Sequence, residues 1–299
     1  MISHMIPAPA PTARVDVATP GAAPGADLAR GASRVLPEET PVALVYNGST
    51  QAVMMATPAD VEDFAVGFTL SEGIAERDAL PEVEVVVHDT PTGPAVEARM
   101  WLPPEAEARL SARRRAAVGP VGCGLCGVDS LAQALRDLSV LPEAHVGLTV
   151  ADAGFALAEL REWQPLHDET RAVHAAGFWR PGDGILMARE DVGRHNALDK
   201  LIGALARAGI DPAMGAIALT SRLSVEMVQK AVVAGSPVLL AVSAPTARAV
   251  RIAEAANLTL ASSSRGELQV FTHPRRIVAR RRGPPEGRPW RMRPVRQAW

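Results

Sequence analysis

The chain has 299 residues, a formal net charge of −2, 47% hydrophobic residues and 21% charged residues. This length suits one large domain or two modest ones, and the composition is typical of a soluble globular protein. It excludes a mostly disordered chain and a uniformly basic nucleic-acid binder. No stretch approaches the roughly 20 consecutive apolar residues of a membrane-spanning helix. We therefore expect neither a membrane nor a nucleic-acid partner.

The two ends of the chain differ in composition from the rest. Residues 1–34 are rich in proline, alanine and glycine, and they lack the basic start and the apolar run of a secretory signal. We expect a disordered extension there. From Arg275 to the end, nine arginines stand against the single acid Glu286. We expect residues 279–299 to form an arginine-rich disordered tail.

Residues 35–120 are expected to form an amino-terminal α+β region. Within residues 41–56, two apolar runs flank Asn47-Gly48, which predicts two strands joined by a tight hairpin turn. Thr57 has the properties of an N-cap and Asp60 completes a capping box, so we expect a helix to begin at Thr57. A second strand pair is expected over residues 83–87 and 95–102.

Residues 121–278 show the pattern of an α/β region. Two paired strands and a helix are expected over residues 170–179, 184–188 and 196–208. After them, segments of strand and helix character alternate, namely residues 215–220, 224–234, 238–242, 246–256 and 258–260. This alternation predicts a parallel, right-handed α/β unit.

The only two cysteines lie in the glycine-rich run Gly122-Cys123-Gly124-Leu125-Cys126-Gly127, and a helix is expected to begin at Ser130. They are too few and too close together for the disulfide framework of a secreted protein, which favours a reducing cytoplasm. A thiol before a helix start is favoured as thiolate, which is its nucleophilic form. From these residues alone, Cys123 and Cys126 could be a redox pair, half of a metal site or a sulfur-handling pair.

Two of these alternatives meet difficulties in the sequence. A zinc site needs about two more ligands, for which His174 and His195 are the best candidates. A zinc nucleobase deaminase has an H-x-E motif before its P-C-x-x-C motif, whereas His167-Asp168-Glu169 follows the cysteines, so we reject that activity. A thioredoxin-like protein has its cysteine pair after the first strand of a βαβ unit, so a disulfide oxidoreductase is disfavoured.

A run of unusually polar residues, from Arg189 to Asn196, precedes a predicted helix. Within this run, Arg194 and His195 are candidates to hold an anionic ligand. Glu190 and Asp191 are the candidates to orient them. The alternative is a solvated helix entrance with internal ion pairs.

Three loops follow predicted strands of the α/β unit and contain small hydroxyl or glycine residues. In such sheets, ligands bind outside the carboxyl ends of the strands, where helix N-termini favour phosphates. Together the loops predict a phosphate-bearing ligand, although a serine or threonine at a helix start is also a typical N-cap. No P-loop motif is present, which disfavours ordinary nucleotide hydrolysis. The candidate residues are Ser221, Arg222, Ser243, Thr246, Ser262, Ser263, Ser264, Arg265 and Gly266.

Segments along most of the chain resemble the FdhD/NarQ family of formate dehydrogenase accessory sulfurtransferases. The resemblance spans about residues 35–278 and includes both the cysteine run and the polar run. An ordered set of this length is far more specific than a C-x-x-C pair alone. The matching segments are residues 39–48, 57–60, 67–68, 71–73, 122–127, 174–176, 190–200, 224–230 and 243–246.

The resemblance implies sulfur transfer. Cys123 is then the persulfide-bearing residue, which takes sulfur from a cysteine desulfurase, and Cys126 is its partner in transfer or resolution. The acceptor is the molybdenum cofactor in its bis(molybdopterin guanine dinucleotide) form, and the client is a formate dehydrogenase. No metal of the protein's own is required. A non-catalytic cofactor-binding chaperone, in which the cysteines only close a lid, is the alternative.

The resemblance also implies a cytidine deaminase-like three-layer α/β fold with a smaller amino-terminal region, and a homodimer. The family's cofactor-binding stretch corresponds to the run from Ser262 to Glu267. Family members commonly have Gly-Phe before it, whereas Ala261-Ser262 stand here, which removes an aromatic side chain that would pack on the cofactor. His174, His195 and Arg194 are expected to stabilise negative sulfur during transfer.

Overall fold

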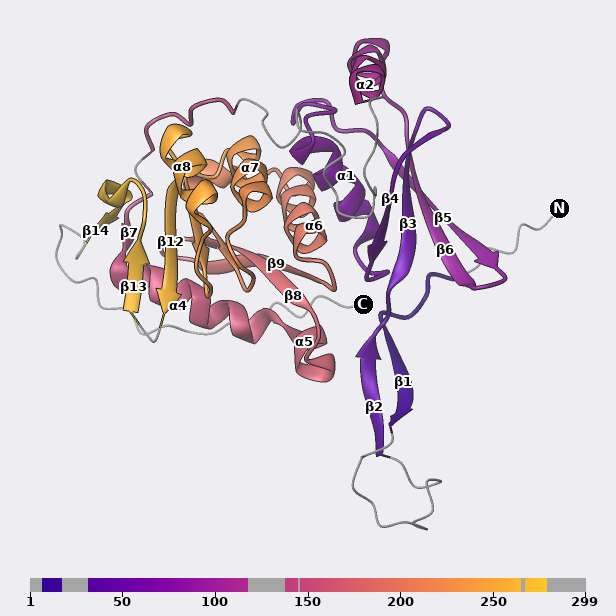
Figure 1. Cartoon of the computed structure of the whole chain (residues 1–299), viewed down its shortest axis with the longest axis horizontal. Helices are drawn as coiled ribbons and strands as arrows, with labels where there is room; N and C mark the ends of the chain where they lie inside the picture. The colour runs from indigo at the N-terminus through magenta and orange to yellow at the C-terminus, as the bar shows by residue number, and fades with distance from the viewer. Residues whose placement is uncertain (1–6, 18–31, 118–137, 145, 265–266, 279–299) are drawn as a thin grey trace.

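The computed structural model describes residues 7–17, 32–117, 138–144, 146–264 and 267–278 (Figure 1). Two sheets organise these residues, a four-stranded sheet in the amino-terminal part and a six-stranded sheet in the rest. No helix within the described ranges is long and apolar enough to cross a membrane.

Helices and strands alternate irregularly in the amino-terminal part. The elements are β1 (Thr12–Val17), β2 (Ala32–Pro37), β3 (Thr40–Tyr46), β4 (Ser49–Ala56), α1 (Val61–Ser71), β5 (Val83–Thr90), β6 (Gly93–Met100) and α2 (Pro104–Ala117). The four-stranded sheet has the order β4-β3-β6-β5, in which two antiparallel hairpins are joined by the parallel pair β3 and β6. Phe64 of α1 packs with Val42 and Leu44 of β3, so α1 covers one face of this sheet.

The remaining elements build the six-stranded sheet and its helices. They are β7 (Leu148–Thr149), α4 (Val150–Leu160), η2 (Arg161–Trp163), α5 (Pro165–Thr170), β8 (His174–Arg180), β9 (Gly184–Asp191), α6 (Arg194–Arg207), η3 (Pro212–Met214), β10 (Ala216–Leu219), α7 (Val225–Ala234), β11 (Val238–Ala241), α8 (Ala247–Ala255), β12 (Thr259–Ser264), β13 (Glu267–Val270), η4 (Pro274–Arg276) and β14 (Ile277–Val278). The sheet order is β13-β12-β11-β10-β8-β9, and β14 pairs with β7 in a separate bridge.

Two hydrophobic clusters show that the six-stranded sheet is the middle of three layers. Leu198, Val228 and Ala253 from α6, α7 and α8 pack on one face of the sheet. Leu157 and Leu160 of α4 pack on the other face (Figure 1). The predicted three-layer α/β arrangement is therefore confirmed, as is the parallel pairing of β10, β11 and β12. The more specific likeness to the cytidine deaminase fold stays a prediction.

The amino-terminal part is joined to the α/β part by a close crossing of α1 and α6. A Cβ atom added at Gly67 would lie 1.7 Å from the Asp199 carbonyl oxygen, and one added at Gly203 would lie 1.9 Å from the Asp63 carbonyl oxygen. Glycine is required at both positions because any side chain would collide with backbone atoms. The two helices therefore pack backbone to backbone.

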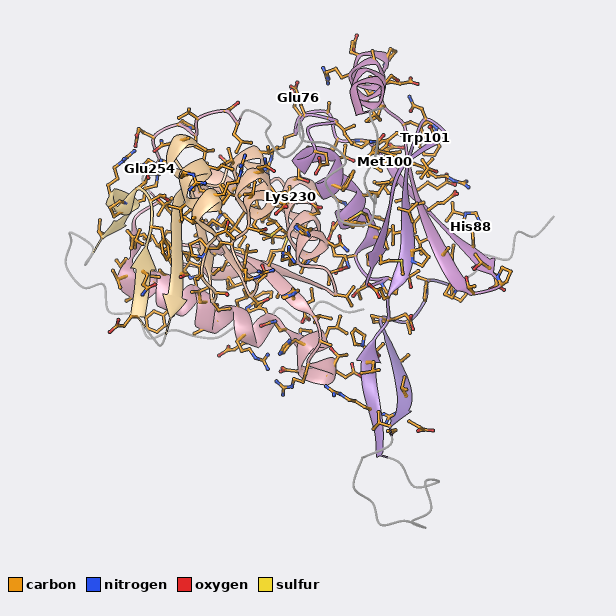
Figure 2. The ribbon with its side chains drawn as sticks, viewed as in Figure 1. Glu76, His88, Met100, Trp101, Lys230 and Glu254 are labelled. Atoms are coloured by element: carbon orange, nitrogen blue, oxygen red, sulfur yellow. The ribbon has the colours of Figure 1, made fainter. Side chains whose placement is uncertain are left out.

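A buried polar network reinforces this crossing from the side of α7. The Nζ atom of Lys230 lies 2.9 Å from Oδ1 of Asp199, and it also donates to Oγ of Ser71 at 2.9 Å. The same ammonium group lies 5.6 Å from the centre of the Phe68 ring. Lys230 is labelled beside the helices in Figure 2 and is almost fully buried. One cation thus connects α1, α6 and α7.

The local predictions for the amino-terminal part are partly confirmed. Asn47 and Gly48 have φ angles of 48° and 77°, as a tight hairpin turn between β3 and β4 requires. The predicted helix start is wrong, because α1 begins at Val61 and its N-cap is Asp60, which makes no side-chain cap bond. Thr57 is fully buried instead, and its backbone N–H donates to Oδ2 of Asp191 at 3.0 Å. A tertiary contact has replaced the local cap.

Two further corrections concern residues 1–34 and residues 170–179. The disordered extension predicted for residues 1–34 is wrong for Thr12–Val17, since this segment forms β1 and pairs antiparallel with β2. The resulting ribbon extends from the body near α5 (Figure 1). The strand predicted over residues 170–179 begins at His174, because Thr170 is the last residue of α5. The helix predicted from Ser130 lies outside the described residues.

Candidate functional site

The strand topology brings most of the predicted ligand-binding segments to one edge of the six-stranded sheet. β10, β11 and β12 are parallel, so their carboxyl ends lie together. β8 is antiparallel to β10, and its first residue, His174, therefore lies at the same edge. His174 pairs in turn with Asp191 at the end of β9, just before α6. We call this edge the strand-end edge.

The turn between β9 and α6 is held by the carboxylate of Asp191, which is fully buried. Its Oδ1 atom accepts from the backbone N–H of Gly193 at 2.7 Å and from the Asn196 amide at 3.0 Å. Its Oδ2 atom lies 2.7 Å from Nζ of Lys200, which is also fully buried. With the Thr57 N–H, which also donates to Oδ2, four groups satisfy one charge, and this makes the turn rigid.

Glu190 has a different role from the one predicted. Its two carboxylate oxygens accept from the backbone N–H groups of Leu166 and His167, both at 2.8 Å. It therefore caps the start of α5. The expectation that Glu190 and Asp191 orient Arg194 and His195 is corrected, because the Glu190 carboxylate binds the backbone of α5 and the Asp191 carboxylate binds groups around the turn before α6. Asp191 thereby positions the start of α6, whereas Glu190 positions α5.

Arg194 and His195 are the first two residues of α6, and each has a side-chain nitrogen atom that a ligand could use. Nε of Arg194 and Nε2 of His195 are buried, and neither has a hydrogen-bond partner among the described residues. The nearest acid to His195 is Glu226 of α7, whose Oε2 atom lies 3.9 Å from Nε2, beyond hydrogen-bond distance. Buried nitrogen atoms without partners favour binding of an additional acceptor.

The two histidines of the strand-end edge are held neutral at pH 7. Burial above all, together with the charges of Arg194 and Lys230 and against the opposing effect of Glu226, lowers the pKa of His195 to about 4. Burial and the charge of Arg194 also lower the pKa of His174. A neutral imidazole can donate a hydrogen bond but adds no positive charge. The cation at this place is therefore Arg194 alone among these three residues.

The predicted residues of the three strand-end loops fall into two groups. Arg222 is exposed and Ser243 is half-buried, so their side chains are accessible. Ser221 and Ser262 are almost fully buried, and Thr246 accepts from the backbone N–H of Ala249 at 3.2 Å as the N-cap of α8. Ser263, which is half-buried, and Glu267, which is exposed, belong to the β12–β13 hairpin. Ser264 belongs to β12, and Arg265 and Gly266 lie outside the described residues.

The two cysteines, Cys123 and Cys126, also lie outside the described residues. Their roles as persulfide carrier and partner stay predictions. Within the described ranges, no three side chains of His, Cys, Asp or Glu are grouped so that they could hold a metal ion. His174 and His195 therefore belong to no such group within those ranges.

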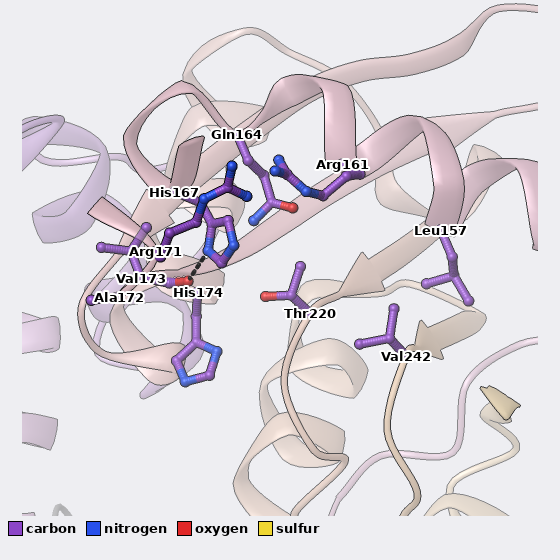
Figure 3. Close-up of a pocket in the computed structure, with 10 residues that line it drawn as sticks. All are labelled: Leu157, Arg161, Gln164, His167, Arg171, Ala172, Val173, His174, Thr220 and Val242. Atoms are coloured by element: carbon purple, nitrogen blue, oxygen red, sulfur yellow. Dashed lines mark hydrogen bonds between the residues drawn. The ribbon is translucent and has the colours of Figure 1, made fainter. Parts of the chain in front are cut away.

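A pocket at the strand-end edge was missed by the sequence analysis. It has a volume of about 560 Å³ and lies on the side of the sheet covered by α4 and α5, with Arg161, Gln164, His167 and Arg171 in its wall (Figure 3). Thr220 and His174 connect it to the strand ends. The sequence had indicated a strand near Arg171, and no motif marks the connection between α4 and β8. The only sign of the pocket in the sequence was that two arginines, Arg161 and Arg171, lie on either side of Pro165.

Fold and site together define a class of protein. A three-layer α/β protein that collects cationic and hydrogen-bonding side chains at the carboxyl ends of parallel strands is suited to bind an anionic ligand there. The predicted resemblance is confirmed at the level of sequence, since the FdhD/NarQ family matches residues 37–278. The chain therefore belongs to the FdhD/NarQ family.

Similar proteins of known name agree with this assignment. The chain is 54% identical over 248 residues to a sulfur carrier protein FdhD of Brucella abortus, covering 82% of this chain and 91% of that one. It is 51% identical over 247 residues to a protein of the same name from Agrobacterium fabrum, with 82% and 90% covered.

One solved structure has a similar fold. It is the crystal structure from Desulfotalea psychrophila described as that of a formate dehydrogenase accessory protein, with a TM-score of 0.63. The identity is 23%, and the similarity covers 89% of this chain and 98% of the other. At this identity, the likeness concerns the fold.

Proposed function

We propose that this protein is a sulfurtransferase that carries sulfur as a persulfide on Cys123. In this proposal a cysteine desulfurase is the donor, and the acceptor substrate is the molybdenum cofactor in its bis(molybdopterin guanine dinucleotide) form. The sulfurated cofactor then serves a formate dehydrogenase. Support comes from membership of the FdhD/NarQ family and from relatives above 50% identity named sulfur carrier protein FdhD. A homodimer in the cytoplasm belongs to the same proposal.

The structural observation that carries the proposal is the pair of unpartnered nitrogen atoms at the start of α6. Nε of Arg194 and Nε2 of His195 are buried without a hydrogen-bond partner in the described part of the chain. An acceptor cofactor with phosphate groups and metal-bound sulfur offers anionic acceptors for both. Neutral His195 would donate one hydrogen bond, whereas Arg194 would supply both a hydrogen bond and a charge.

The sulfur chemistry that we propose conserves atoms and electrons. The Cys123 thiolate attacks the outer sulfur of the donor persulfide, a new S–S bond forms, the donor S–S bond breaks, and the donor leaves as a thiolate. For release, the Cys126 thiolate attacks the inner sulfur of the Cys123 persulfide. The outer sulfur leaves as hydrosulfide toward the acceptor. The two cysteines supply the two electrons and end as a disulfide.

Intact-protein mass spectrometry tests the proposal directly. The full chain is incubated with a cysteine desulfurase and cysteine, and wild type is compared with Cys123→Ala and Cys126→Ala. We expect a gain of about 32 Da per sulfur in wild type and in Cys126→Ala, reversed by a reducing agent and lost in Cys123→Ala. A wild type that takes up no sulfur, yet binds the guanine dinucleotide cofactor, would instead identify a cofactor-binding chaperone.

The role of Arg194 and His195 needs its own variants. In Arg194→Gln and His195→Ala, sulfur loading on Cys123 reports the donor step, and sulfur passing to a pre-bound cofactor reports the acceptor step. We expect loading to stay normal and transfer to fall at least tenfold in Arg194→Gln. Transfer at the wild-type rate in both variants would remove these residues from the mechanism. Arg180→Gln, at the end of β8 away from this edge, is the matched control for loss of one positive charge.

A further inference from the structure

Arg276 is a buried arginine that lies away from the strand-end edge. It is the last residue of η4 and is only 3% exposed. Its Nη1 atom donates to the hydroxyl oxygen of Thr259 at 3.2 Å. Thr259 is the first residue of β12, which runs parallel to β11, so this contact lies at the amino ends of the strands. The six residues of β12 put about 16 Å between Thr259 and the strand-end edge.

The rest of the Arg276 guanidinium group has no partner. Nε and Nη2 are buried, and neither forms a hydrogen bond within the described part of the chain. These two nitrogen atoms lie on the same edge of the planar group, since Nη2 is the terminal nitrogen on the side of the Nε hydrogen. Two parallel N–H bonds of this kind match the two oxygen atoms of a carboxylate. One complete bidentate edge of Arg276 is thus unused.

The acid in the surroundings of Arg276 is engaged elsewhere. Glu143 is the acid whose charge acts on Arg276, but its Oε1 atom lies 2.6 Å from Nη2 of Arg275. The Thr259 hydroxyl, which holds Nη1 of Arg276, donates to the His273 carbonyl oxygen at 2.9 Å. Among the described residues, the guanidinium group of Arg276 therefore has one hydrogen bond and no ion pair.

A buried guanidinium group in this state is suited to a negatively charged ligand. Arginine stays protonated at every physiological pH, and a buried charge without a partner costs free energy. Buried charges in proteins are paired, and their polar atoms are hydrogen-bonded. A ligand that brings one negative charge and two acceptor oxygen atoms would satisfy the unused edge of Arg276.

The surroundings favour a small, planar anion. Both free nitrogen atoms are buried, so a ligand with large substituents does not fit beside them. The neighbouring buried hydroxyl of Thr272 is already used, because it donates to the Leu258 carbonyl oxygen at 2.6 Å and accepts from the Leu260 N–H at 2.9 Å. A tetrahedral phosphate would bring further oxygen atoms that need donors of their own. A carboxylate needs only the edge that Arg276 offers.

We infer that Arg276 binds a small carboxylate through its Nε and Nη2 atoms, at the amino ends of the strands. Formate is the smallest carboxylate and carries only a hydrogen atom on its carbon, so it suits an enclosed place. Binding of a carboxylate here does not depend on sulfur transfer. Only the choice of formate as the natural ligand rests on the proposed function, because formate is the substrate that the client dehydrogenase oxidises.

Thermal unfolding of the full chain tests the inference, in sodium formate and in sodium chloride of the same ionic strength. We expect formate to raise the melting temperature of wild type above that in chloride, because a ligand of the folded chain stabilises it and chloride cannot accept at two points. Line broadening of isotope-labelled formate in NMR gives the dissociation constant. Arg276→Lys keeps the charge but loses the bidentate edge, so it should bind formate about tenfold more weakly.

Arg276→Met separates a ligand site from a structural role. It removes an unpaired buried charge, so its melting temperature in chloride should equal or exceed that of wild type, while the effect of formate is lost. Arg180→Gln is the matched control, because Arg180 is an exposed arginine paired with Asp183 at the same end of the sheet. It should leave formate binding unchanged. An equal effect of formate on wild type and Arg276→Met would overturn the inference.

Acetate and inorganic phosphate, measured in the same way, test the class of ligand. Weaker binding of acetate than of formate supports an enclosed site, whereas equal binding removes formate as the natural ligand. Phosphate binding at least as strong as formate binding would overturn the assignment to a carboxylate. A wild type that takes sulfur on Cys123 but does not bind formate overturns this inference alone. Formate binding without sulfur loading contradicts the proposed function and leaves the carboxylate site in place.

Discussion

The two sides of the strand-end edge are built in opposite ways. In the turn before α6, Asp191 and Lys200 form a buried ion pair in which both side chains are 0% exposed. On the α5 side, Arg161, Arg171 and Asp168 form a loose, exposed cluster. Buried pairs hold a structure rigidly because breaking one leaves an isolated charge, whereas exposed pairs exchange partners at little cost. The buried pair therefore fixes the geometry of the edge, whereas the exposed cluster can exchange its partners.

The strongest way to break this comparison is to remove one buried acid. In Asp191→Ala, Lys200 loses its charge partner in a fully buried place, and the N–H groups of Thr57 and Gly193 lose their acceptor. We expect the free energy of unfolding to fall by about 3–5 kcal/mol. Urea denaturation measures it, with Asp168→Ala as the exposed control, for which no measurable change is expected. Equal losses in both variants would contradict the difference between the two sides.

A glycine exchange compares one helix from each face of the sheet. In α6, a methyl group at Gly203 would collide with the Asp63 carbonyl oxygen of α1, so Gly203→Ala should destabilise the protein by about 3 kcal/mol. In α4, nothing lies within 4 Å of a Cβ atom added at Gly154. Gly154→Ala should stabilise by about 0.5–1 kcal/mol, because alanine favours a helix. Thermal unfolding measures both, and a neutral Gly203→Ala would mean that the two helices separate easily.

The pH dependence of the free energy of unfolding tests the same comparison, with a smaller expected effect. The folded pKa of His195, about 4, lies below the usual value of 6.5, so the unfolded chain binds more protons between these pH values. The contribution of His195 to the free energy of unfolding should therefore be fully present above about pH 6.5 and be lost as the pH drops toward 4. With partial solvent screening, the loss is about 2 kcal/mol for this group.

His195→Gln isolates this contribution, because it keeps a polar side chain that does not titrate. We expect the pH dependence of the unfolding free energy between pH 6.5 and 4.5 to become flatter in the variant. Arg194, Lys230 and Glu226 are the charged groups that act on this ring, so their states must be the same in both proteins. An NMR titration of His195 that gives an ordinary pKa would contradict the expectation.

Local patterns in the sequence predicted the elements that depend on neighbouring residues. The turn at Asn47-Gly48 was predictable because few residues adopt positive φ angles easily. The alternation of strands and helices from β10 to β12 was predictable because the spacing of apolar residues that indicates each element can be recognised within a short segment. The helix start predicted at Thr57 was wrong although the local sequence matches a cap pattern, because the partner of Thr57 in the structure, Asp191, lies 134 residues away in the sequence.

The sequence by itself determined the family, the parallel α/β unit and the location of Arg194 and His195 at a helix start. Only the tertiary structure decided that Asp191 holds the turn from within, that burial keeps His195 neutral, and that Arg161, Gln164 and Arg171 line one pocket. The physical reason is that burial and pairing depend on which distant segments meet. Helical period, turn conformation and residue type are local properties, whereas the environment of a charge is made by the whole fold.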